Sequence, residues 1–315
     1  MSREIYSELM KALVEGSFVF TGEIEPVKTT NLHEVLETAK ILKGNVVAAN
    51  VTDNPTAFGY LNALIPSWAI QEKVGLEAVY QMTCRDRNRL ALLSDFLAAG
   101  ALGIKNVLAL TGDHVSAGDD PRAKPVFDLD SATMVQMLRK MTDEGMDLAG
   151  NKIIDPPRFH IGIAANPGAD PLEPEILKIK RKVKLGAEFI QTQAIYDVEV
   201  AKRFVMEAEY LKIPILVGIA PLKSLAMLDW MVRFVPGIAI PENIQERLRK
   251  AREEGGKEGL YQENIRIFGN MVQEIKETTS AAGIHVMAIG FEWIVPKILG
   301  ASGLRVENGV SSQHF

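Results

Sequence analysis

The chain has very little cysteine. Its 315 residues include a single one, Cys84. One cysteine excludes a disulfide within the chain and an iron–sulfur cluster held by this chain alone, and it is typical of a protein from a reducing compartment. Cys84 follows an apolar run, so the simplest interpretation is a small buried residue.

Long hydrophobic runs and an excess of positive charge are also missing. No apolar run reaches the roughly 18 residues of a membrane span. The N-terminal segment Met1–Tyr6 carries charges where a signal peptide has its apolar core. The formal net charge is −5, so nothing indicates non-specific binding to nucleic acid. We expect a cytoplasmic protein without a membrane or nucleic-acid partner.

Signature motifs of several enzyme classes are absent from the sequence. No G-x-G-x-x-G follows a strand pattern, which argues against a Rossmann dinucleotide-binding domain. No G-x-S-x-G is present, which argues against a serine hydrolase. Histidines and cysteines do not cluster, so we expect no metal site.

Eight short apolar runs are present, and each is followed by at least one helix pattern. Continuous apolar runs are typical of parallel strands that are covered on both faces. We therefore expect an α/β fold, an eight-stranded parallel β/α barrel of the TIM type. The expected strands are 18–26, 45–52, 76–83, 107–114, 159–166, 189–193, 214–221 and 283–290.

The chain shows no linker and no internal repeat, so we expect one barrel domain over 1–315. A short helix at 4–15 precedes the first strand, extra helices precede the last strand, and about 304–315 form a loose tail. The loop at 115–125 is too long for a simple connector, which is typical of functional or mobile loops. The expected helices are 4–15, 32–43, one within 58–73, 86–101, 130–143, 173–185, 198–211, 222–232, 241–252, 258–280 and 291–299.

Polar side chains mark the ends of six of these strands. The carboxyl ends of barrel strands form the active-site face, so we expect these side chains to meet at one mouth. Amides and hydroxyls with few charges suit a flat heterocycle such as a flavin or pterin, although many sugar-binding barrels share the pattern. The residues are Glu23, Glu25, Asn50, Thr52, Gln81, Thr83, Thr111, Asp113, Asn166, Gln191 and Gln193.

Asp113 and the basic helix at 173–185 both have simpler explanations. Asp113 at a strand end could equally be a turn former or a helix cap. The basic helix at 173–185 could be a solvated face. Its spacing nevertheless places Lys178 one turn from Arg181 and Lys182. Beside the mouth, that face could hold a phosphate or pyrophosphate.

The sequence resembles the 5,10-methylenetetrahydrofolate reductase family from about Phe18 to the region of Gly303. The order and spacing of the shared segments carry the resemblance. They are Gly-Glu-Ile-Glu-Pro at 22–26, Met-Thr-Cys at 82–84, Leu-Ala-Leu-Thr-Gly-Asp at 108–113, the segment 180–193, Gly-Ile-Ala-Pro at 218–221, and 283–292.

The resemblance implies an eight-stranded β/α barrel that binds FAD. It implies hydride transfer from reduced FAD to 5,10-methylenetetrahydrofolate, giving 5-methyltetrahydrofolate. Glu23 matches the acid proposed to open the imidazolidine ring, and Glu25 could supply a like charge that raises its pKa. Asp113 matches the family aspartate that stabilises the iminium cation and fixes the pterin. Gln193 matches a glutamine that contacts the folate.

Further positions match contacts to the flavin or its phosphates. They are Asn50, Gln81, Thr111, Gly112, Asp113, Asn166, Arg181 and Lys182, to which the spacing adds Lys178. The sequence departs from well-studied NADH-using members at three of the matched positions. Thr111 stands where they carry arginine, Gln81 where they carry histidine, and Leu225 where a phenylalanine stacks on the nicotinamide.

The departure at Leu225 argues against direct use of NADH. The overall pattern is similar to reductases of anaerobic bacteria, acetogens among them, some of which work with a partner subunit. We therefore expect electrons from an iron–sulfur or other electron-transfer partner, and an oligomeric protein. Two alternatives stay open. One is a pterin-dependent methyltransferase that hands a methyl group to a corrinoid, and the other is a flavin-free folate-binding barrel that acts as a scaffold.

Overall fold

The strands form a closed barrel in the computed structural model, which describes residues 3–235 and 237–304. All neighbouring strands are parallel, in the order β1 to β8, and β8 pairs with β1. This confirms the fold expected from the apolar runs. The strands are β1 (Val19–Ile24), β2 (Ala48–Val51), β3 (Glu77–Thr83), β4 (Asn106–Leu110), β5 (His160–Ala165), β6 (Phe189–Ala194), β7 (Ile215–Ile219) and β8 (Gly283–Val286).

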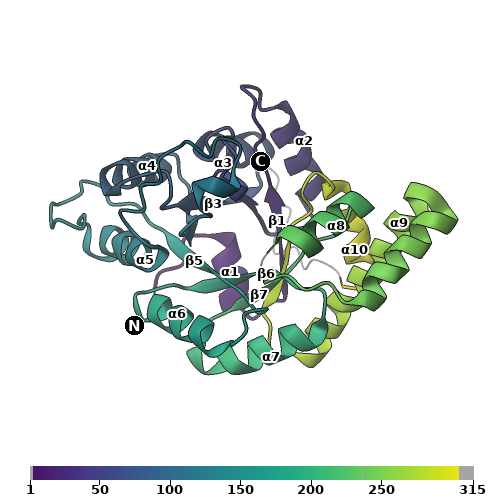
Figure 1. Cartoon of the computed structure of the whole chain (residues 1–315). Coiled ribbons are helices and arrows are strands. Elements are labelled where there is room, and N and C mark those ends of the chain that lie inside the picture. Colours follow the sequence, from purple (N-terminus) through teal and green to yellow (C-terminus); the bar gives the residue numbers. More distant parts are fainter. Residues whose placement is uncertain (1–2, 236, 305–315) are drawn as a thin grey trace, which may run out of the picture.

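Helices surround the barrel, as Figure 1 shows. Side chains cap the N-termini of several of them, since Asn88, Asp130 and Ser224 each accept a backbone N–H. The helices are α1 (Glu8–Val14), α2 (His33–Leu42), α3 (Leu64–Ala69), α4 (Arg89–Ala101), α5 (Ser131–Arg139), α6 (Glu173–Lys184), α7 (Val198–Ala208), α8 (Leu225–Phe234), α9 (Glu242–Thr278) and α10 (Val295–Ala301), with short turns η1 (Pro55–Ala57), η2 (Ile70–Val74), η3 (Val115–Ala117), η4 (Lys140–Glu144), η5 (Glu209–Leu211) and η6 (Glu292–Ile294).

The amino-terminal end of the barrel is closed by α1. Ser7 caps this helix through a bond from the Met10 N–H to its hydroxyl (3.1 Å), and the Glu77 carboxylate of β3 accepts from the Leu9 N–H (2.9 Å). Leu9 and Met10 then pack in one apolar cluster with Phe189 of β6. The helix expected at 4–15 therefore begins only at residue 8, and the closed end leaves the opposite face for the site.

The barrel interior changes from apolar to polar along its axis. Phe189 fills the interior near the amino-terminal end of the barrel. It fits there because Gly162 lacks a Cβ, which would lie 2.3 Å from the ring. Above this level the inward side chains are amides, a hydroxyl and an imidazole rather than the branched apolar residues common in such barrels. These buried residues are Thr21, Asn50, Gln191 and His285. The polar layer lies directly beneath the mouth.

The long helix α9 is a hairpin of two arms. Gly256 has φ 62° and ψ −148°, outside the helical region, and it separates the arms. Arg247 of the first arm pairs with Glu263 of the second (2.7 Å). This confirms the two extra helices expected at 241–252 and 258–280, and Figure 1 shows the hairpin at the edge of the barrel. Among the described residues, no helix combines the length and apolar character needed to cross a membrane.

The helix expected within 58–73 is confirmed as the short α3, which is followed by the π-helical η2. Other expected boundaries were wrong. The strand expected at 283–290 ends at Val286, and Ile289 (φ 47°) and Gly290 (φ 72°) take left-handed conformations. The loop at 115–125 begins with η3. Of the tail expected at 304–315, all but Leu304 lies outside the described residues.

Candidate active site

Glu23 lies at the mouth near the end of β1, and its side chain is 15% exposed. Gln81 of β3 donates from Nε2 to Glu23 Oε2 (3.0 Å), and His285 Nε2 lies 3.6 Å from the same oxygen. No hydrogen bond to Oε1 is found within the described ranges. One carboxylate oxygen of Glu23 therefore accepts from Gln81 and faces His285, and the other makes no hydrogen bond to a described residue.

Glu25 follows the end of β1 and is half-buried. Burial raises the pKa of Glu25, the charges of Glu23 and Glu292 raise it further, and Lys223 opposes them. The charge of Glu23 thus acts on Glu25. The effect expected in the other direction, of Glu25 on Glu23, stays a prediction.

The polar layer beneath Glu23 is one connected set of hydrogen bonds. Asn50 Nδ2 donates to Gln191 Oε1 (2.7 Å), and Gln191 Nε2 donates back to Asn50 Oδ1 (3.0 Å). Gln191 Nε2 also donates to Thr21 Oγ1 (3.2 Å), which lies 2.9 Å from His285 Nδ1. Asn50 is fully buried here, with its amide used by Gln191.

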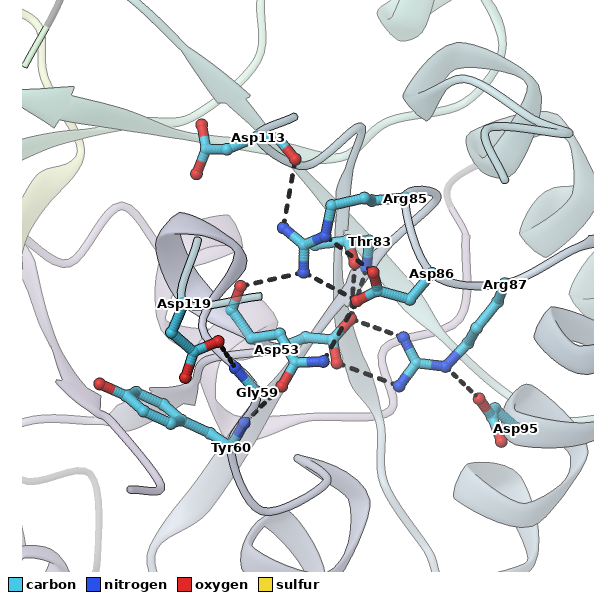
Figure 2. A network of polar contacts seen from close by, with 11 residues as sticks. Asp53, Gly59, Tyr60, Thr83, Arg85, Asp86, Arg87, Asp95, Asp113 and Asp119 are labelled. Carbon is cyan, nitrogen blue, oxygen red and sulfur yellow. Dashed lines mark hydrogen bonds and ion pairs between the residues drawn. The ribbon is translucent and has the colours of Figure 1, made fainter. Parts of the chain in front are cut away.

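Asp113 comes three residues after β4, on an exposed segment. Its backbone carbonyl accepts from Arg85 Nη1 (3.4 Å), while its carboxylate points away from that guanidinium in Figure 2. Gly112 has φ 91°, and a Cβ there would lie 3.0 Å from Thr83 Cβ and 3.1 Å from Arg85 Cβ. The segment therefore packs tightly on the β3–α4 connection, and the carboxylate of Asp113 is left exposed.

Arg85 is almost fully buried beneath this segment (1% exposed). It donates from Nε and Nη2 to the Asp86 carboxylate (2.8 and 2.7 Å) and from Nη2 to the Asn54 carbonyl (3.0 Å). Asn54 has a left-handed backbone (φ 46°) and donates from Nδ2 to Asp86 Oδ2 (3.1 Å). Arg85 thus ties together the connections that follow β2, β3 and β4.

A second ion pair continues this network, as Figure 2 shows. Arg87 donates to both carboxylate oxygens of Asp53 (2.8 and 3.1 Å) and pairs with Asp95 (2.8 Å). The backbone N–H and the hydroxyl of Thr83 both donate to Asp53 Oδ2 (2.9 and 2.8 Å). Asp53 is 3% exposed, so a buried carboxylate is fully paired at the base of the mouth loops.

The other expected site residues lie on neighbouring strand ends. Thr111 donates from Oγ1 to Ser131 Oγ at the start of α5 (3.1 Å). Asn166 follows β5, and its Oδ1 accepts from the Gly168 N–H (2.9 Å). Gln193 is exposed near the end of β6, and Leu225 is half-buried in the first turn of α8. All four therefore belong to the carboxyl-terminal face of the barrel.

The three basic residues of α6 differ in their surroundings. Lys178 pairs with Glu175 (2.5 Å), and the exposed Arg181 lies 3.6 Å from Asp130. Lys182 makes no ion pair with any residue in the described part of the chain. Burial lowers the pKa of Lys182, Lys178 adds to that effect, and Glu175 and Asp130 oppose it. Of these three basic residues, Lys182 is therefore the one whose charge no described ion pair compensates.

The described residues include no group of three or more histidine, cysteine or carboxylate side chains placed to hold a metal. Cys84 is buried, and burial raises the pKa of its thiol to about 12. A thiol in that state is a poor nucleophile and a poor ligand at neutral pH.

Sequence reasoning missed three residues of this region, His285, Arg85 and Asp53. His285 stands in an apolar strand and could have been noticed, because strand alternation and barrel closure place it inside the barrel. Arg85 and Asp53 follow strands in segments rich in charge, where turn formation is the ordinary interpretation. No local signal separates a buried ion pair from a solvated turn.

Comparison with known proteins gives one family. The sequence model of the methylenetetrahydrofolate reductase family matches residues 8–303. A 5,10-methylenetetrahydrofolate reductase of Pectobacterium carotovorum is 26% identical over 69% of this chain and 69% of its own length. Methylenetetrahydrofolate reductase 2 of Schizosaccharomyces pombe is 27% identical over 94% of this chain and 47% of its own. The chain covers 33% of a probable methylenetetrahydrofolate reductase (NADPH) of Caenorhabditis elegans, at 25% identity.

Solved structures resemble the chain in fold alone. EDTA monooxygenase from Chelativorans sp. BNC1 aligns with a TM-score of 0.56 at 11% identity, over 94% of this chain and 96% of that one. Long-chain alkane monooxygenase aligns with a TM-score of 0.53 at 12% identity, over 94% of each chain. The sequence matches, together with the barrel and its polar mouth, show that this chain belongs to the methylenetetrahydrofolate reductase family.

Proposed function

We propose that the chain reduces 5,10-methylenetetrahydrofolate to 5-methyltetrahydrofolate with FAD as its cofactor. One observation carries the proposal beyond family membership. Glu23 stands at the mouth with one carboxylate oxygen held by Gln81 and the other available. The reaction requires an acid at this place, because the bridged ring of the substrate must open before it can accept a hydride.

The donor set fits FAD. Lys182 is a half-buried ammonium without an ion pair among the described residues, and a pyrophosphate beside it would supply a compensating anion. Amides and hydroxyls at the strand ends suit the hydrogen-bonding edge of an isoalloxazine ring. When bound, FAD would supply the hydride. The residues proposed to hold it are Gln81, Thr111, Gly112, Asp113, Asn166, Lys178, Arg181 and Lys182. Asn50, which we also expected to contact the flavin, is fully buried beneath them with both amide atoms bonded to Gln191.

The protein's own groups would open the ring. Glu23 gives its proton to N10 of the substrate, the bond from N10 to the bridging carbon breaks with its electron pair going to N10, and a 5-iminium cation remains. The exposed carboxylate of Asp113 stabilises that cation and orients the pterin. Gln193 contacts the folate, and Glu25 and Leu225 line the substrate side of the mouth.

We also propose that electrons reach the flavin from an iron–sulfur or other electron-transfer subunit, as in reductases of anaerobic bacteria, in an oligomeric assembly. Support comes from Leu225, an aliphatic residue where an aromatic ring would stack on nicotinamide. Stopped-flow mixing of the flavin-loaded chain with NADH tests this proposal. Slow or absent bleaching of the flavin is expected, and rapid bleaching would contradict it.

The Glu23→Gln variant tests the acid. It should retain its flavin and lose the formation of 5-methyltetrahydrofolate, since an amide cannot donate a carboxylic proton. Glu292→Gln removes a neighbouring carboxylate to which no role is assigned, and it should remain active. A fully active Glu23→Gln protein would remove the proposed acid. A protein that transfers methyl groups without any flavin would favour the methyltransferase alternative.

A further inference from the structure

His285 lies inside the barrel, directly beneath the mouth. It belongs to β8, is 2% exposed, and is flanked by Thr21 of β1 and Gly218 of β7 in the strand register. Its Nε2 faces Glu23 Oε2 at 3.6 Å. An imidazole buried at this depth usually has a partner on each nitrogen. Here the two nitrogens face groups of different kinds, a hydroxyl and the carboxylate of the proposed acid.

One direction of the hydrogen-bond chain below His285 satisfies every member. The Gln191 amide nitrogen donates to Asn50 Oδ1 and to Thr21 Oγ1 (3.0 and 3.2 Å), and it also lies 3.4 Å from His285 Nδ1. The Thr21 hydroxyl then accepts from Gln191 and, in this direction, gives its own proton to His285 Nδ1 at 2.9 Å. In the neutral imidazole, an accepting Nδ1 leaves the proton on Nε2. That proton is directed at Glu23.

The geometry points to His285 as a positioning residue for Glu23. This inference rests on the proposed function of Glu23 as the acid. Oε2 would receive two donors, Gln81 Nε2 at 3.0 Å and His285 Nε2 at 3.6 Å, and the second contact would shorten when substrate is bound. Two donors on Oε2 place the acidic proton on Oε1. The barrel interior thereby selects which oxygen of Glu23 protonates the substrate.

Two substitutions at this position separate positioning from mere packing. Asparagine places its amide near Nδ1 and retains the contact with Thr21, whereas glutamine places its amide near Nε2 and retains a donor to Glu23. Both are polar and similar in size, so each controls for the folding effect of the other. Single-turnover reduction of 5,10-methylenetetrahydrofolate would be measured anaerobically on the flavin-loaded full chain.

We expect His285→Asn to lower the single-turnover rate constant by about 10- to 100-fold, the effect of one hydrogen bond to a charged group. The folate concentration that gives half the maximal rate should change by less than about threefold. His285→Gln should stay within about fivefold of the unsubstituted protein. Equal losses in the two variants would overturn the inference.

A measurement without turnover separates this inference from the proposed function. Nitrogen-15 NMR of the histidine-labelled protein, assigned with His285→Asn, reports the tautomer at mildly alkaline pH, where histidines are generally neutral. A proton on Nε2 is expected. A proton on Nδ1 would reverse the chain of donors and overturn the inference, whether or not the protein reduces folate. An Nε2 proton in a protein that fails to reduce folate would contradict the function alone.

Discussion

Replacing Arg87 by methionine tests how the mouth loops are held. Methionine preserves much of the aliphatic length and removes the guanidinium. The change would break both bonds to Asp53 (2.8 and 3.1 Å) and the pair with Asp95 (2.8 Å). Asp53 Oδ2 would keep its two bonds from Thr83, whereas Oδ1 would lose its donor. Because the Asp53 side chain is only 2% exposed, water would not replace the missing charge without a rearrangement.

Breaking a buried pair by removing one partner costs about 3–5 kcal/mol, and the bonds that Thr83 keeps favour the lower value. For 315 residues, at about 2.1 cal/mol/K of unfolding entropy each, a loss of about 3 kcal/mol lowers Tm by about 4–5 °C. Differential scanning fluorimetry would measure the shift. The control is Arg122→Met, whose pair with Asp120 is exposed (89% and 56%) and is worth at most about 1 kcal/mol. Equal shifts in the two variants would refute this account of the network.

Three further predictions concern the mouth. Lys182→Met should weaken FAD binding about 10- to 100-fold, measured by flavin fluorescence. Lys178→Met, which removes an exposed ammonium already paired with Glu175, should weaken it less, and equal losses would contradict the assignment. Gly112→Ala should slow turnover and destabilise the fold, because Gly112 has φ 91° and a Cβ there would meet Thr83 and Arg85 at about 3.0 Å. Gly103→Ala is the control, since Gly103 has φ 75° and nothing within 4 Å of its Cβ position, so that it carries the backbone strain alone. Equal urea midpoints for the two variants would argue against tight packing at Gly112. Glu25→Gln should stabilise the fold at neutral pH, because burial raises the folded pKa of Glu25 and its ionisation therefore costs stability above the unfolded value of about 4.3. The gain should vanish below about pH 4 in urea titrations, and a gain independent of pH would contradict this cause.

The positions of the strands and of their polar ends could be predicted because both signals are local. An apolar run such as Val107–Leu110 marks a buried strand, and the residues after it then fall at the carboxyl-terminal face of any β/α barrel. Glu23 and Asp113 were found in this way, and the structure places both at that face. Boundaries were less predictable. The pairing of β8 ends at Val286, and the left-handed backbone of Ile289, an unusual conformation for a β-branched residue, has no sequence signal.

The parts that escaped prediction depend on contacts across the barrel. His285 meets Glu23 only because β8 closes on β1, so its role follows from closure and register together. Arg85 and Asp53 look like ordinary turn residues in sequence, and their burial arises from three loops packing on one another. The basic helix shows the same limit. Spacing grouped Lys178, Arg181 and Lys182, but only the structure shows that Lys182 lacks an ion pair in the described ranges.

The central claim is that this barrel reduces 5,10-methylenetetrahydrofolate with a bound flavin and with Glu23 as the acid. Its most direct test is to reduce the flavin-loaded protein by light under anaerobic conditions and to mix it with the folate. The account predicts that the blue absorption band of oxidised flavin returns as 5-methyltetrahydrofolate forms, and that Glu23→Gln protein keeps its flavin reduced. A flavin that stays reduced in the unsubstituted protein, or a Glu23→Gln variant that reoxidises equally fast, would contradict it.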